Sequence, residues 1–256
     1  MVQKPSRSKL EIQPLTCYNE SMSVFISGVI LVLVALILTC MQLVPGVFIL
    51  FYHYALGKNS AKKAHGFSPY FILGYVVFLV TTWFIIHNLI FSIFYHLGDT
   101  STQFFSWALA GILLAESVLS FLFYYRKGKF TELFISRPVA KALDVHAQNS
   151  KTRTDAFTLG FLSGIPELIF TFPLFTISST ALMKINPILR TSALILSLLI
   201  VILPFIYLVY LFHFDHNLAE IERLRIRFKP IFRLTICLGF LALAFAAINL
   251  GFSYYG

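Results

Sequence analysis

The feature that most constrains the fold is a series of apolar runs, the first of which extends from Val24 to Gly57. As a helix, this run would reach roughly 50 Å, whereas the hydrocarbon core of a bilayer is about 30 Å thick. It is nevertheless too short for two full spans joined by a loop. Pro45 has no N–H and Gly46 bends freely, so the run predicts one membrane helix that is broken or steeply tilted at this pair.

Composition supports a membrane location for most of the chain. The 256 residues are 58% hydrophobic and only 12% charged, with a mean hydropathy of +0.81. A soluble domain is nearer to about 25% charged. Five further apolar segments follow the first, at about residues 68–94, 104–125, 156–183, 191–214 and 231–252. The sequence therefore predicts an all-α integral membrane protein with six transmembrane helices.

The six spans fall into two groups of three. We expect a polar extracytoplasmic N-terminus, a first three-span repeat, a basic cytoplasmic loop and a second three-span repeat, over residues 1–21, 22–125, 126–155 and 156–256. An odd number of spans per unit gives the two units opposite orientations in the membrane. The layout predicts two inverted three-helix repeats in which spans 1 and 4 are broken by proline, which is typical of transporters.

Basic residues predict the orientation of the chain. Fifteen of the 20 Lys and Arg residues lie in or beside the loops that follow spans 1, 3 and 5. The positive-inside rule places these loops in the cytoplasm and both termini outside a cell (plasma) membrane. The net charge of +9 is explained by loops that face membrane lipid, and no nucleic-acid-binding motif accompanies it. We therefore expect lipid, and no nucleic acid, as a partner.

Motifs for catalysis are missing from the sequence. It contains no Walker-type loop, GxSxG or HExxH. Its three cysteines, Cys17, Cys40 and Cys237, have no spacing typical of a metal site. We expect neither an enzyme nor a bound cofactor or metal.

Two carboxylates stand inside apolar spans and are the main site candidates. Glu167 follows Pro166 near the middle of span 4, and Pro166 cannot donate to the Leu162 carbonyl. A carboxylate in a membrane span is costly, so it indicates a cation site or a proton carrier. Glu116, in the middle of span 3, either pairs with a cation or shares a proton with Glu167. A hydrogen bond that only packs helices together is the alternative for both.

The breaks in spans 1 and 4 supply the remaining candidates. Gln42 stands just before Pro45 and Gly46, and its amide both donates and accepts in an apolar setting. Pro173 is the second proline of span 4. A simple proline kink is the alternative to a binding role.

Small and hydroxyl side chains in span 4 have two interpretations. Gly160 and Gly164 are four residues apart and predict close helix packing. The hydroxyls either line a path or bond back to their own helix; they belong to Thr171, Thr176, Ser178 and Ser179.

The Pro45-Gly46 break, the following Gly57-Lys58 loop and the segment GFLSGIPELIFTFPLF at Gly160–Phe175 together resemble the lysine exporter (LysE) superfamily, which includes the DsbD transmembrane family. The resemblance implies a three-plus-three helical core. The chain departs from the pattern at the thiols, because DsbD-like carriers have a cysteine beside the proline of spans 1 and 4. Here Cys40 lies five residues before Pro45, and Glu167 follows Pro166. The exporter branch usually has a second proline where Val47 stands.

Three functions remain open from the sequence. The first is a secondary transporter or exporter of a small solute or ion, which works by alternating access around a site between spans 1 and 4. The second is a transmembrane thiol electron carrier that uses Cys40. The third is a non-transporting assembly or accessory protein that binds a partner through residues 126–155 and 216–230. A homodimer or a larger membrane complex is compatible with each.

Overall fold

The structure is a computed structural model that describes residues 28–41, 61–96, 99–122, 145, 152–183, 187–214 and 218–252. Regular structure in these ranges is entirely helical. A helix over Gly28–Met41 is followed by α2 (Ala61–His96), α3 (Asp99–Leu122), α5 (Arg153–Ser163), the 3-10 turn η1 (Ile165–Glu167), α6 (Leu168–Met183), α7 (Pro187–Phe214) and α8 (Leu218–Phe252).

Five segments are long and apolar enough to cross a membrane: Gly66–His96, Gln103–Leu122, Arg153–Met183, Arg190–Tyr210 and Pro230–Asn249. Gly28–Met41 is a shorter apolar helix. Large apolar side chains also cover the outer surface, where Leu203 is 66% exposed and Phe84 is 64% exposed. Such a surface suits hydrocarbon and would be unfavourable in water. The chain is therefore a multi-pass, all-α membrane protein, as the sequence predicts.

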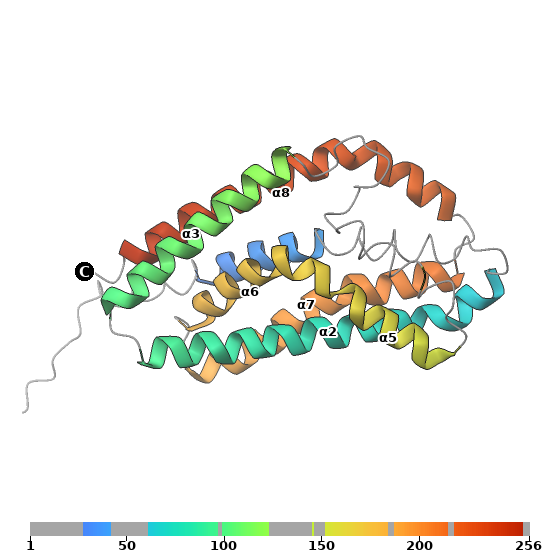
Figure 1. Ribbon diagram of the computed structural model, residues 1–256, viewed down its shortest axis with the longest axis horizontal. Coiled ribbons are helices and arrows are strands. Elements are labelled where there is room, and N and C mark those ends of the chain that lie inside the picture. The colour runs from blue at the N-terminus through green and yellow to red at the C-terminus, as the bar shows by residue number, and fades with distance from the viewer. Residues whose placement is uncertain are drawn as a thin grey trace, which may run out of the picture.

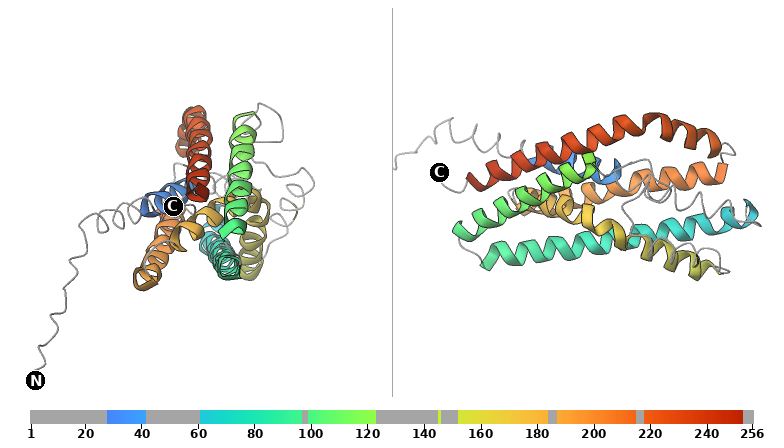
Figure 2. Two further views of the ribbon diagram at one scale, coloured as in Figure 1. Left: turned by 90° about the vertical axis from the view of Figure 1, so that its left-hand side faces the viewer. Right: turned by 45° about the horizontal axis from the view of Figure 1, so that its top comes forward.

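Successive helices run in alternating directions through the bundle (Figure 1). α2, α5 and α8 begin at one end, whereas α3 and α7 begin at the other end, where the C-terminus also lies. α3 packs along α8, and α2 packs along α5 and also contacts α6 and α7. The end-on view in Figure 2 shows α3 and α8 on one side of the bundle and α2 and α7 on the other.

Two helices at the centre join the two sides. The Gly28–Met41 helix contributes Val32 and Leu36 to an apolar cluster with α2 and α7. From its other face it contributes Leu38 to a second cluster with α3 and α8. α6 likewise places Phe175 in the first cluster and Leu174 in the second. The Gly28–Met41 helix and α6 therefore form the core that both sides of the bundle share.

Glycines bring α2 and α5 into close contact. A methyl group on Gly160 would overlap the backbone carbonyl of Phe71, and one on Gly74 would overlap that of Phe157. A methyl group on Gly164 would overlap the ring of Phe78. The predicted packing role of Gly160 and Gly164 is confirmed, since small residues let backbones approach in membranes.

Span 4 begins with a capping box and contains a 3-10 turn. The Thr152 hydroxyl accepts from the Asp155 amide at 3.1 Å, and the Thr152 amide donates to the Asp155 carboxylate at 2.9 Å. The α-helical pattern ends at Ser163 and resumes at Leu168 after the turn that contains Pro166. Pro173, by contrast, lies inside α6.

Two helices extend upstream of their predicted spans, although the apolar segments Gly66–His96 and Pro230–Asn249 agree with those spans. α2 begins at Ala61, so Pro69 lies in its interior. α8 begins at Leu218, so the charged amphipathic segment and span 6 form one helix that continues through Pro230. The predicted break at Pro45-Gly46, with Gln42, lies outside the described residues.

Candidate functional site

The Glu167 side chain is buried at the turn between α5 and α6. Pro166 has no N–H that could donate a hydrogen bond. The Gly164 amide donates to the carbonyls of Phe161 and Leu162. The Glu167 amide donates to the Gly164 carbonyl at 3.1 Å, and its own carbonyl accepts from the Thr171 hydroxyl at 3.0 Å. The backbone of the turn is thus satisfied locally, while the carboxyl group, on a residue only 6% exposed, extends from it into the bundle.

Tyr75 of α2 is the polar neighbour of Glu167. The two groups interact electrostatically, and Tyr75 is 1% exposed. Its hydroxyl has no hydrogen-bond partner. The Tyr75 ring lies 5.3 Å from the ring of Phe205 on α7, measured between centroids. We call Tyr75 and Glu167 the central carboxyl site; it lies where α2, α7 and the turn of span 4 meet.

The chemistry of this pair suits a small polar ligand. A carboxylate accepts hydrogen bonds or coordinates a cation, and a phenol hydroxyl both donates and accepts. A buried hydroxyl without a partner costs about 1–3 kcal/mol, which a ligand or water at this position would recover. The central carboxyl site can therefore hold a proton, a cation or a hydrogen-bonding solute.

Most hydroxyls of α6 bond to their own helix. Thr176, Ser178 and Thr180 each donate to the carbonyl four residues earlier, at 2.7 to 2.9 Å. Thr171 does the same at Glu167. Ser179 differs: it is fully buried, and its hydroxyl has no hydrogen-bond partner. Of the four hydroxyls that were candidates for lining a path, three instead bond to their own helix, and only the Ser179 hydroxyl lacks a partner.

Glu116 lies in a different interface, between α3 and α8. It is 4% exposed, and its Oε2 has no hydrogen-bond partner. Next to it, the Ser117 hydroxyl donates to the Cys237 carbonyl at 2.9 Å. Ser120 is fully buried without a partner for its hydroxyl, and the Arg233 guanidinium lies 5.0 Å from the centroid of the Phe121 ring.

These groups form what we call the α3–α8 polar seam, made of Glu116, Ser117, Ser120, Arg233 and Cys237. In the part of the chain that the structure describes, no hydrogen bond joins Glu116 on α3 to Glu167 in the turn of span 4. No direct contact therefore supports the prediction that Glu116 and Glu167 share a proton.

The two described thiols are also apart. Cys40 faces α7, where its sulfur lies 3.9 Å from the Ile200 carbonyl oxygen. Cys237 faces α3, with its sulfur 3.3 Å from the Ser117 hydroxyl. Both are free. Among the described side chains, no three of His, Cys, Asp or Glu come together as metal ligands.

Tyr75 and Arg233 are residues that sequence reasoning did not single out. Tyr75 continues a buried stripe on α2 that includes Ile72 and Leu79, so helical spacing places it in the core. Its neighbour Glu167 is far away in sequence, which no local pattern reveals. Arg233 was counted only as a basic residue at the start of span 6, although it lies within the apolar segment Pro230–Asn249.

Comparison with known proteins gives no relative for this chain. No protein-family model, no curated protein and no solved structure matches it.

Proposed function

We propose that this protein is a secondary transporter or exporter of a small solute or ion, which works by alternating access around the central carboxyl site. In support of a site between spans 1 and 4, Tyr75 packs in one apolar cluster with Val32 and Leu36 of the Gly28–Met41 helix, and Glu167 directly precedes α6. The proposal includes a cell-membrane location with both termini outside, as the distribution of basic residues predicts. Membership of the LysE/DsbD superfamily stays a prediction from the resemblance.

The observation that carries the proposal is the buried carboxyl group of Glu167 at a helix interruption in the middle of a membrane protein. A carboxyl group at this depth is costly and is retained where it has a function. Irregular backbone at membrane depth is likewise found where it is buried in protein or lines a cavity. The unpartnered hydroxyl of Tyr75 adds a second group that needs a ligand.

The arrangement of the helices supports the inverted-repeat layout. If the chain is divided at residues 126–155, the second helices of the two halves are α2 and α7, and the third helices are α3 and α8. Each of these pairs is in contact. The first helices, Gly28–Met41 and span 4, share both apolar clusters. Equivalent helices thus lie together, an arrangement that is compatible with a pseudo-two-fold axis in the membrane plane.

The two alternatives receive less support. Electron transport needs an attacking thiolate and a resolving partner, and Cys40 and Cys237 contact different helices. An accessory role would depend on residues 126–155, of which 126–144 and 146–151 lie outside the described ranges, and on the charged start of α8. A variant with all three cysteines replaced by serine that keeps its transport activity would exclude the electron carrier.

The proposal is tested by transport currents in proteoliposomes on a solid support. Purified protein is challenged in turn with Mg²⁺, Mn²⁺, Zn²⁺ and the common amino acids. We expect a saturable current for at least one of these solutes, and its loss by at least about tenfold in Glu167→Gln, which keeps the shape of the side chain but not its charge.

Ser178→Ala is the matched control for this experiment. Ser178 lies in the same membrane span and is also buried, but the change to alanine removes only a hydrogen bond to the Leu174 carbonyl. The current should survive this change. A current that is unchanged in Glu167→Gln would remove Glu167 from the mechanism and with it the proposed site.

A further inference from the structure

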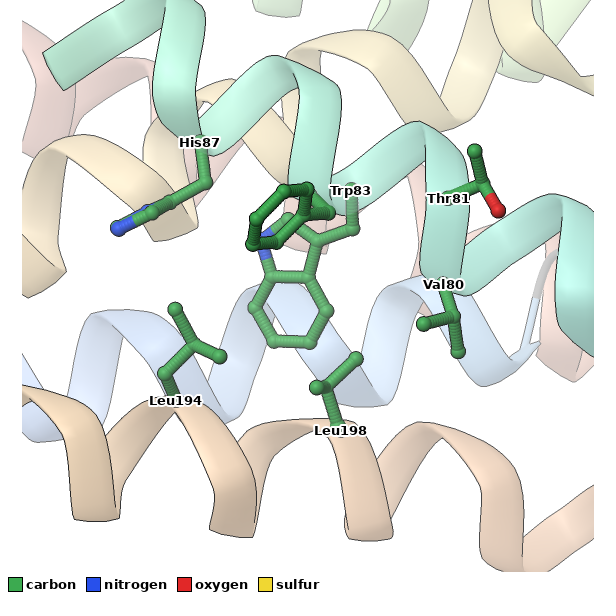
Figure 3. Close-up of a pocket in the computed structure, with 7 residues that line it drawn as sticks. Val80, Thr81, Trp83, His87, Leu194 and Leu198 are labelled. Carbon is green, nitrogen blue, oxygen red and sulfur yellow. The ribbon is translucent and has the colours of Figure 1, made fainter.

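A second feature, unrelated to the central carboxyl site, is a pocket of about 270 Å³ between α2 and α7 (Figure 3). Its lining is almost entirely apolar and comes from Val80, Thr81, Trp83, Phe84 and His87 of α2 and from Leu194 and Leu198 of α7. Thr81 and Phe84 are exposed on the outer surface. Because this surface faces the bilayer, the molecules at the mouth of the pocket are lipids.

Trp83 leaves a hydrogen-bond donor at the pocket. Its ring is stacked on that of Phe175 from α6, with centroids 5.5 Å apart and planes inclined by 10°. It is 2% exposed, yet its indole N–H has no acceptor. The close-up shows the indole between the two helices, with its nitrogen on the side of His87 (Figure 3). A ligand that supplied an acceptor oxygen here would satisfy a group that is costly to leave unpaired.

A basic residue that does not itself line the pocket influences the His87 end of it. Arg190 of α7 interacts electrostatically with His87, and its guanidinium donates to the Met183 carbonyl at 3.0 Å, which holds it at the end of α6. The buried Nδ1 of His87 has no hydrogen-bond partner. Arg190 is also the first residue of the apolar segment Arg190–Tyr210. The charge therefore lies at the membrane boundary.

The residues at the pocket change from polar to apolar along the direction of the helices. On α7, Arg190, Leu194 and Leu198 follow one another at four-residue intervals, so about 12 Å separates the charged end from the apolar end. On α2, the antiparallel sequence His87, Trp83, Val80 passes from polar to apolar in the same direction. This order of cation, hydrogen-bond donor and apolar wall matches the phosphate, ester carbonyl and acyl chain of a phospholipid.

We propose that the α2–α7 pocket binds one anionic phospholipid. Its acyl chain fills the apolar part, its ester carbonyl accepts from the Trp83 indole, and its phosphate faces Arg190 and His87. The volume is at the lower limit of pockets that hold drug-sized ligands, which start at about 300 Å³, and it suits part of a single chain. The proposal does not depend on transport.

The experiment uses tryptophan fluorescence, because the chain has only two tryptophans. Trp107→Phe leaves Trp83 as the sole reporter. This variant is reconstituted into two sets of phosphatidylcholine vesicles. One set contains a small fraction of brominated phosphatidylglycerol, and the other contains the same fraction of brominated phosphatidylcholine. Bromine quenches indole fluorescence on contact. We expect brominated phosphatidylglycerol to bind in the pocket about fivefold more tightly than brominated phosphatidylcholine. This is the gain in affinity that one nearby basic residue gives for an anionic headgroup.

Three controls separate the pocket from the bulk bilayer. Trp83→Phe leaves Trp107, which is 43% exposed on α3, and both brominated lipids should quench it equally. Arg190→Gln added to Trp107→Phe should remove the preference for phosphatidylglycerol. Arg153→Gln removes a charge at the opposite end of the bundle and should leave the preference intact.

Two results would overturn the proposal. Equal quenching of Trp83 by both lipids in the Trp107→Phe protein would mean that no anionic headgroup is recognised. Quenching of Trp83 by neither lipid would mean that the pocket excludes acyl chains, whether it is closed or covered by a second copy of the chain. Both readings come from the Trp107→Phe protein alone, so they stand even if Arg190→Gln does not fold.

Discussion

Glu116 and Glu167 are both buried carboxylates, but their surroundings differ. Glu167 interacts electrostatically with Tyr75 of α2. Glu116 lies in the α3–α8 polar seam, and its Oε2 has no hydrogen-bond partner. A buried acceptor that stays unpaired destabilises a fold by about 1–3 kcal/mol. The seam is therefore a local weakness of the structure.

Replacing Glu116 by leucine should stabilise the protein. Glu116→Leu replaces the unpaired group with an apolar side chain of similar size, so we expect about 1–3 kcal/mol of added stability. Thermal unfolding in detergent measures this as a rise of several degrees. Ser117→Ala, which loses the bond to the Cys237 carbonyl, should shift the midpoint downward. A lower midpoint for Glu116→Leu would mean that the carboxyl group has a stabilising partner.

Single residues were predictable where chemistry contrasts with the surrounding sequence. Glu167 and Glu116 are conspicuous because they are charges within apolar runs. Tyr75 was not predicted, because one tyrosine in a membrane span is unremarkable until its neighbour is known. That neighbour comes from the other half of the chain, and hydropathy holds no information on which helices meet.

At the scale of helices, the backbones of α2 and α5 approach each other closely where the two helices cross. Gly74 and Gly160 face each other's helix so closely that neither has room for a methyl group. This crossing fixes α5 on α2 and thereby sets the position of the turn that carries Glu167. Packing at these glycines is thus a structural condition for the central carboxyl site.

Adding one methyl group at the crossing should destabilise the bundle. Gly160→Ala would overlap the Phe71 carbonyl, which is backbone and cannot move aside as a side chain can. We expect a loss of about 1–3 kcal/mol, measured as a lower midpoint of thermal unfolding in detergent. Gly111→Ala is the control, because nothing lies within 4 Å of its added methyl group. Equal midpoints for the two variants would contradict the close packing.

Apolar runs predicted the existence of the helices well, but not their ends. α8 extends upstream through residues 218–229, where charged and apolar residues alternate in a pattern that a helix accommodates as readily as a loop. α2 extends upstream of Pro69 because one proline removes one hydrogen bond without ending a long helix. Hydropathy marks where a chain is in hydrocarbon, and a helix can continue beyond that boundary.

At the scale of the whole molecule, the alternating directions of the helices bring the basic loops of the sequence to one end of the bundle. The starts of α2, α5 and α8 lie at one end of the bundle (Figure 1). The loops that lead to these starts are the three basic loops of the sequence. The positive-inside rule therefore predicts that this end is cytoplasmic and that the end with the C-terminus is outside.

Thiol labelling tests this orientation. In a variant without native cysteines, Tyr95→Cys places a thiol at the end of α2, where the residue is 78% exposed, and Arg153→Cys places one at the exposed start of α5. A membrane-impermeant maleimide should label the first in intact cells and the second only after permeabilisation. The reverse pattern would place both termini in the cytoplasm.

If the protein is a transporter, its central carboxyl site is reached from both sides of the membrane, and this access can be measured without knowledge of the cargo. Tyr75→Cys places a thiol opposite Glu167 in a chain that lacks native cysteines. Leu79→Cys is the matched control, because it lies one turn away on the same buried face and is 2% exposed. Both are reconstituted into vesicles and treated with an impermeant, cationic methanethiosulfonate, added first on one side and then on the other.

Alternating access predicts that the thiol at position 75 is modified from either side, at least about tenfold faster than the thiol at position 79, which stays in a dry core. Modification of position 75 from one side alone, or equal protection of both positions, would contradict the account of this protein as a transporter.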